Sequence, residues 1–184
     1  MSFQEFILGF ETLISGFAAA RFFQGWGEMI KYRRKFRYYW AHLLTTLVAF
    51  FILIQYWWGS FYRDTDSQVS TIWEFMFLLS VPATFYFMAI QLYPTYRGQS
   101  VDLRVYFQRN LRAYAGYLFT YYALQTFRHL YYDLPMFDDR GITRAVGMTL
   151  SALLFVTNSR RLAEWVVVVA GIIILWFFTF VEPA

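Results

Sequence analysis

The sequence predicts an all-α fold: a single integral membrane domain over residues 1–184, built as a bundle of six transmembrane helices with both termini on the outer, non-cytoplasmic side. Three observations support this prediction. The chain is 59% hydrophobic and only 15% charged, whereas a soluble domain is about half apolar and about one quarter charged. Six stretches are long and apolar enough, or nearly so, to cross a bilayer. The basic residues gather in alternate connections between these stretches.

The number of crossings follows from the thickness of a membrane. A hydrocarbon core of about 30 Å needs about 20 mostly apolar residues, since a helix rises about 1.5 Å per residue. The stretches that meet this requirement, or nearly meet it, are 4–26, 38–61, 70–93, 111–131, 142–157 and 162–181. They take up most of the chain, so the remainder leaves no room for a soluble domain.

Two of the six stretches are weak. The first carries Glu11 and Arg21, and one charge at a helix centre costs about 2.5–3.5 kcal/mol on the insertion scale. We expect this helix to bury one face against its neighbours; the alternative is that it lies in the interface and leaves five crossings. The fifth stretch is short and begins beside Arg144, so it would tilt little or thin the bilayer.

The orientation follows from the positive charges. The connections that carry most of them are the first, third and fifth, with Lys31, Arg33, Arg34, Lys35 and Arg37, then Arg97, Arg104, Arg109 and Arg112, then Arg160 and Arg161. The acidic residues run the opposite way, with Asp64, Asp66 and Asp133 in the even connections. Basic residues in short loops stay in the cytoplasm. We therefore expect these three connections to be cytoplasmic, in a bacterial inner membrane, with an organellar membrane as the alternative.

Aromatic residues agree with this layout. Trp26 and Trp165 fall at the predicted cytoplasmic interface, and the pair Trp57 and Trp58 falls at the outer one. An indole ring is apolar but its N–H prefers a polar partner, so tryptophans form belts at headgroup depth.

The first connection is the strongest candidate for a lipid contact. Its basic residues are Lys31, Arg33, Arg34, Lys35 and Arg37. Beside an anionic leaflet each such charge contributes about 1 kcal/mol of attraction. The net charge of +4 could also suggest nucleic acid, but the positive residues are spread over three short connections that flank apolar stretches. We expect membrane lipids as partners, and no nucleic acid.

The residue inventory argues against enzyme chemistry. The sequence has no cysteine, which excludes disulfides and thiolate metal sites. Its two histidines, His42 and His129, fall at opposite membrane faces, roughly 20 Å or more apart, so they cannot share a metal or haem within one subunit. The sequence contains no nucleophile elbow, Walker motif or HExxH. We therefore expect no enzymatic activity, no metal and no cofactor.

Polar residues inside the stretches are the default place to look for function in a membrane protein. On this layout they gather in the outer third, and the set predicted to bind a substrate or ion is Glu11, Gln55, Glu74, Gln125, Arg128 and His129. Gln125 and Arg128 share a helix face, and on the first stretch so do Gln4, Glu11, Ser15 and Ala18. Either Glu11 or Glu74 could pair with Arg128 in a pocket open to the outside. The alternative is that such a pair only ties helices together.

Two further features bear on packing. Pro82 interrupts the third stretch, where it removes one backbone hydrogen bond and predicts a kink that could act as a hinge or simply serve packing. Thr12, Gly16 and Ala20 form a stripe of small residues on the first stretch, which would let a neighbouring helix approach closely.

These observations favour two functional classes. The first is a small multi-pass channel or transporter for an ion or small solute, with a polar cavity in its outer half. It would work as a homo-oligomer, because one copy of six short helices can hardly enclose a wide pore. The second is a non-catalytic membrane subunit or sensor of a larger membrane complex.

Overall fold

The computed structural model describes residues 3–61, 69, 71–96, 98–132 and 139–180. Within them the chain is helical almost throughout, which confirms the all-α prediction. The α-helices are α1 (Phe3–Lys31), α2 (Trp40–Phe61), α3 (Ile72–Leu92), α4 (Leu103–Tyr131), α5 (Asp139–Thr157) and α6 (Arg160–Phe180). The remaining elements are a short 3-10 helix, η1 (Arg33–Lys35), and two-residue strands β1 (Phe36–Arg37) and β2 (Val101–Asp102).

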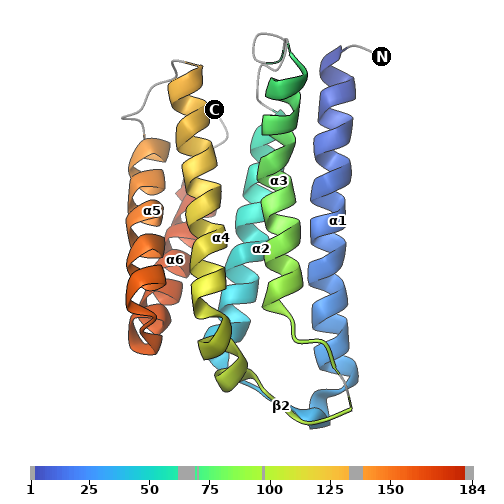
Figure 1. Ribbon diagram of the computed structural model, residues 1–184, viewed down its shortest axis with the longest axis vertical. Coiled ribbons are helices and arrows are strands. Elements are labelled where there is room, and N and C mark those ends of the chain that lie inside the picture. The colour runs from blue at the N-terminus through green and yellow to red at the C-terminus, as the bar shows by residue number, and fades with distance from the viewer. Residues whose placement is uncertain (1–2, 62–68, 70, 97, 133–138, 181–184) are drawn as a thin grey trace.

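The helices form two layers (Figure 1). Helices α5, α4, α3 and α1 stand side by side in one layer, and α2 and α6 lie behind them. Successive helices run in opposite directions, so α1 begins and α6 ends at the same end of the bundle. Helix α4 is packed between α3 and α5, and α2 contacts both α1 and α6.

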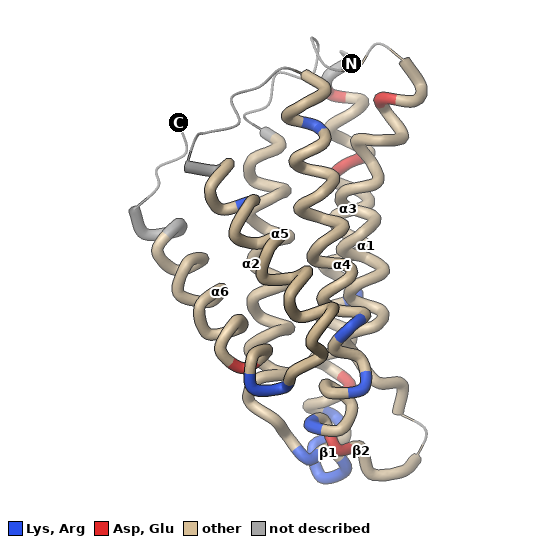
Figure 2. Tube along the Cα trace, turned by 60° about the vertical axis from the view of Figure 1, so that its left-hand side comes forward, with Lys and Arg blue, Asp and Glu red and all other residues tan. Residues whose placement is uncertain are grey.

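Charge divides the bundle lengthwise. Figure 2 shows most of the lysines and arginines at one end, around β1, β2 and the first turns of α4 and α6. We call this the basic end, and the opposite one the acidic end, where Glu5, Glu11 and Glu74 lie. The three connections predicted to share one side thus do lie at one end of the molecule. Asp64, Asp66 and Asp133, expected at the acidic end, lie outside the described residues.

The outer surface is apolar, as a membrane protein requires. Phe17, Phe23 and Trp165 are 57%, 58% and 71% exposed. Exposed apolar side chains on this scale are unfavourable in contact with water, whereas contact with lipid carries no such penalty.

Three helical segments are long and apolar enough to cross a membrane: Glu5–Lys31, Trp40–Ser60 and Ile72–Leu92. The apolar segment Gly141–Thr157 is shorter. Helix α4 has 29 residues but includes four arginines and many tyrosines, so its composition alone does not mark it as a crossing. The chain therefore carries helices that fit a membrane, and the full set of six crossings stays a prediction.

A short parallel pairing at the basic end was not predicted. Phe36 pairs with Val101 and Arg37 with Asp102, and the side chains of the second pair approach to 3.6 Å. Asp102 also caps α4, because its carboxylate accepts hydrogen bonds from the backbone N–H groups of Arg104 and Val105. The pairing thus joins the first connection to the third, where α2 and α4 begin.

Helix α3 continues through Pro82, which is buried. Neighbouring hydroxyls bond to backbone carbonyls: Thr84 donates to Ser80 at 2.8 Å, and Ser80 donates to Phe77 at 2.6 Å. The role of Pro82 as a hinge stays a prediction.

Two glycines allow close approaches between helices. A Cβ on Gly25 of α1 would lie 2.2 Å from the ring of Tyr93, which follows α3, and one on Gly147 of α5 would lie 2.3 Å from the ring of Tyr122 on α4. Gly16, in the predicted stripe of small residues, has open space beside it. Thr12 of the same stripe accepts a hydrogen bond of 3.3 Å from Nε1 of Trp57 on α2, so the stripe is open within one copy of the described chain at Gly16 but not at Thr12.

We expect Gly147→Ala to lower the free energy of unfolding by about 1–3 kcal/mol, because the added methyl group overlaps the Cζ end of the Tyr122 ring, which would have to move between α4 and α5. The control is Gly16→Ala, which adds the same group in open space and removes a flexible residue from a helix. Unfolding in detergent, followed by tryptophan fluorescence, measures both. Equal stability of the two variants would contradict the close α4–α5 packing.

Candidate functional site

The predicted outer polar residues are distributed over several helix contacts. Glu11 of α1 is fully buried, and its Oε1 accepts a hydrogen bond of 2.5 Å from the Tyr56 hydroxyl of α2. Glu74 of α3 accepts one of 3.1 Å from the Tyr131 hydroxyl of α4. These two carboxylates therefore belong to different helix pairs, and each ties one pair together.

Glu74 also has a local structural role. Its side chain and that of Thr71 form a capping box, in which each accepts a hydrogen bond from the other residue's backbone N–H. Capping satisfies two of the backbone donors that the start of a helix leaves open. This role explains the position of Glu74 without a ligand.

The other predicted site residues lie on α2 and α4. His129 of α4 places its Nε2 2.8 Å from Nη1 of Arg144, a buried residue of α5. Gln55, Gln125 and Arg128 are half-buried. The two cavities described below both lie at the basic end, so the predicted outer pocket stays a prediction.

A more continuous arrangement runs between α1 and α2. On α1 the buried face includes Glu11, Ser15 and Ala18, which were predicted to share a face, and continues with Phe22. Buried residues of α2 step by four and three along the helix, as a single helix face requires; they are His42, Thr46, Ala49, Leu53 and Tyr56. Thr46 and Tyr56 hydrogen-bond to α1, whereas His42, at the end of this face, packs against aromatic rings of α4. We call the contact between these two faces the α1–α2 seam.

The seam is polar at both ends and apolar in the middle. The Glu11–Tyr56 hydrogen bond lies at the acidic end. Toward the basic end, Nε1 of Trp26 donates to the Thr46 hydroxyl at 3.0 Å, and His42 lies one turn before Thr46. His42 and Tyr56 are 14 residues apart, so about 21 Å of helix separates the two polar ends.

His42 is fully buried although its imidazole is polar. The rings of Tyr106 and Phe107 approach it edge-on, with centroids at 6.0 and 6.2 Å. Among the residues that the structure describes, neither ring nitrogen of His42 has a hydrogen-bond partner. A buried polar group in this situation is costly and is an unusual feature of a folded protein.

Further polar groups surround His42 at this level. Tyr93, directly after α3, lies beside Thr46, and Arg21 of α1 is near its hydroxyl. Burial raises the pKa of Tyr106, and the Arg21 charge opposes that shift. Arg21, His42, Thr46, Tyr93 and Tyr106 thus form an inner polar cluster contributed by α1, α2, α4 and the end of α3.

Sequence reasoning missed this cluster. His42 and Thr46 are visible as polar positions, but Tyr93 and Tyr106 lie at the two ends of a connection and resemble interfacial aromatic residues. Only the fold brings them to the same level of the bundle.

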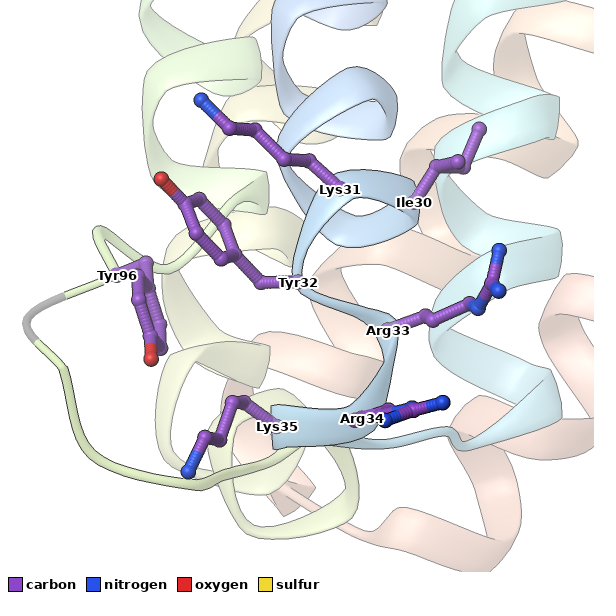
Figure 3. A pocket seen from close by; sticks show the side chains of 7 residues that line it. All are labelled: Ile30, Lys31, Tyr32, Arg33, Arg34, Lys35 and Tyr96. Atoms are coloured by element: carbon purple, nitrogen blue, oxygen red, sulfur yellow. The ribbon is translucent and has the colours of Figure 1, made fainter.

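The basic end contains an open cavity of about 530 Å³. Figure 3 shows the seven side chains around it, from the end of α1, η1 and the segment after α3. Four of the five predicted lipid-binding residues line it: Lys31, Arg33, Arg34 and Lys35. The fifth, Arg37, instead lies 3.6 Å from Asp102.

Two tyrosines shape one wall of this cavity. The rings of Tyr32 and Tyr96 stack with centroids 4.3 Å apart, and the Lys31 ammonium lies 5.3 Å from the centre of the Tyr32 ring. In Figure 3, Lys31 and Lys35 flank this stack, whereas Arg33 and Arg34 point to the other side. The cavity thus combines positive charge with aromatic surface, which suits an anionic headgroup.

Comparisons of the chain with known protein families, with curated proteins and with solved structures found no match.

We expect Tyr56→Phe to lower the free energy of unfolding by about 1–3 kcal/mol, because it deprives the buried Glu11 carboxylate of a hydrogen-bond donor. Tyr114→Phe is a matched control, since the Tyr114 hydroxyl is buried and donates no hydrogen bond to any described residue. That variant should be neutral or slightly more stable. Chemical unfolding in detergent measures both, and a neutral Tyr56→Phe would remove the Glu11–Tyr56 contact as a stabilising interaction.

Proposed function

We propose that this chain is a small channel or transporter that moves protons or a small cation along the α1–α2 seam. The observation that carries the proposal is the burial of two ionisable side chains, Glu11 beside Tyr56 of α2 and His42 one turn before Thr46, near the two ends of the seam. Ionisable groups inside membrane helices are rare and commonly mark ion paths or proton relays.

The membrane setting supports this proposal. In the orientation that the positive-inside rule favours, the basic end faces the cytoplasm of a bacterial cell and both termini face outward. Glu11 then lies toward the outside and His42 toward the cytoplasm. The charge in the connections and the exposed aromatic surface are consistent with this placement.

Each end of the seam can hold a proton. A carboxylate such as Glu11 can accept one from the outer side while the Tyr56 hydroxyl holds it in position. The free nitrogens of His42 can accept a proton and release it toward the basic end. Ala18, Phe22 and Leu53 separate the two groups, so transport requires this apolar layer to open and admit water.

Helix α3 offers a means of opening that layer. Phe85 of α3 is fully buried, and its ring lies 6.2 Å from that of Tyr56. Pro82, one turn before Phe85, lacks the N–H that would continue the helix ladder. A bend at this proposed hinge would move Phe85 relative to the seam.

A second candidate is supported by a separate observation. The small-residue stripe of α1, with Thr12, Gly16 and Ala20, is exposed and has open space at Gly16. Such a stripe suits close contact with another membrane helix. It fits a second copy in a homo-oligomeric transporter, and it fits equally a non-catalytic subunit or sensor held in a larger membrane complex. In that second case the buried charges of the seam would serve packing only.

Reconstitution in liposomes distinguishes the two candidates. With a pH-sensitive dye inside and a potassium diffusion potential across the membrane, we expect the wild-type protein to carry a current of protons or cations. Positioned proton donors and acceptors contribute 10²–10⁴-fold to proton-transfer rates, so we expect Glu11→Gln and His42→Phe each to lower the flux at least about tenfold.

The matched control is Glu28→Gln, which makes the same change on α1 outside the seam, where Glu28 accepts a hydrogen bond from Gln24. It should retain the wild-type flux. If the wild-type protein is inserted and folded but carries neither a proton flux nor a current, the transport proposal is contradicted. The non-catalytic subunit or sensor is then the better proposal. Unchanged flux in both seam variants would place the path elsewhere.

A further inference from the structure

A second cavity at the basic end is bordered by arginines from two helices. Its volume is about 380 Å³, and its lining residues are Arg104, Val105, Gln108, Arg109 and Arg160. The first four belong to the start of α4, and Arg160 begins α6. Figure 2 shows lysines and arginines gathered at this end of the bundle.

The cavity is held in shape by contacts between the two helices. Nε2 of Gln108 donates a hydrogen bond of 3.0 Å to the backbone carbonyl of Asn158, in the turn between α5 and α6. Asn158 adopts a left-handed backbone conformation, with φ of 46°, which marks a tight turn. The start of α6, and with it Arg160, is thereby fixed against α4.

The cavity retains a surplus of positive charge. Glu164 lies 3.4 Å from Nε of Arg160, and it also accepts a hydrogen bond from Tyr39. It offsets one of the three arginines. Arg104 and Arg109 are both exposed. An anion in the cavity would therefore meet guanidinium groups from two sides.

We propose that this arginine cavity binds the headgroup of an anionic phospholipid of the cytoplasmic leaflet, with a phosphate and a neighbouring hydroxyl, as in a phosphoglycerol headgroup. Guanidinium groups form paired hydrogen bonds with phosphate oxygens. The Oε1 atom of Gln108 is buried and accepts no hydrogen bond from the described residues. It can accept one from a headgroup hydroxyl, which a bare phosphate group does not offer.

The surroundings favour a lipid over a dissolved phosphate. Val105 lines the cavity and is 64% exposed. Trp165, little more than one turn beyond Arg160, is also largely exposed, and exposed tryptophans occupy headgroup depth. The cavity therefore lies where a phospholipid places its phosphate, with apolar surface beside it for the acyl chains. This site is separate from the cavity at Lys31–Lys35.

The test is lipid binding by the full chain in a nonionic detergent, measured by native mass spectrometry with phosphatidylglycerol, phosphatidic acid and phosphatidylcholine. We expect phosphatidylglycerol to bind best. The triple variant Arg104→Gln, Arg109→Gln and Arg160→Gln should weaken that binding at least about tenfold, since charge-assisted hydrogen bonds are lost. Its control is the double variant Arg112→Gln and Arg161→Gln, which removes exposed positive charge from residues that line neither cavity and should retain this binding.

Lipid binding by two further variants completes the test. Gln108→Leu should reduce the preference for phosphatidylglycerol over phosphatidic acid. The single variant Arg109→Gln should weaken phosphatidylglycerol binding without disturbing the Arg160–Glu164 contact. Equal weakening by the triple variant and by the Arg112/Arg161 control would reduce the site to general charge attraction and overturn the proposal. Displacement of the lipid by inorganic phosphate or glycerol phosphate at comparable concentration would overturn the assignment to a lipid. Neither outcome bears on transport, which the liposome flux measures separately.

Discussion

The separation of positive charge to one end of the bundle is the constraint on which this fold depends. Arginine and lysine side chains are expensive in hydrocarbon, so the connections that carry them must gather on one aqueous face. Each helix then has to run in the direction opposite to its predecessor. The same crowding of charge forms the second cavity of the basic end, because arginines of α4 and α6 are brought side by side there.

Features set by local sequence could be predicted. Helix positions follow from runs of apolar residues, and the buried face of α1 follows from the spacing of Glu11, Ser15 and Ala18. The partners of those faces could not be predicted, since spacing along one helix does not identify its neighbour. Tyr56 as the partner of Glu11, the β1–β2 pairing and the meeting of His42 with Tyr106 all join residues far apart in the sequence.

Helix α4 illustrates why composition is an incomplete guide to the number of crossings. It lies between α3 and α5, so neighbours cover much of its surface. Tyr114 is buried there, and His129 meets Arg144 of α5. A helix sheltered in this way needs few lipid-facing residues, whereas a hydropathy average treats every residue as if it met lipid. The polar character of α4 is therefore compatible with the six-crossing prediction.

The pairing of β1 with β2 has a mechanical consequence. It fastens together the points at which α2 and α4 begin, while the far ends of these helices have no such fastening among the described residues. Relative movement of the two helices is therefore smallest at that end and grows with distance from it. A widening of the bundle between α2 and α4 would therefore start at the acidic end.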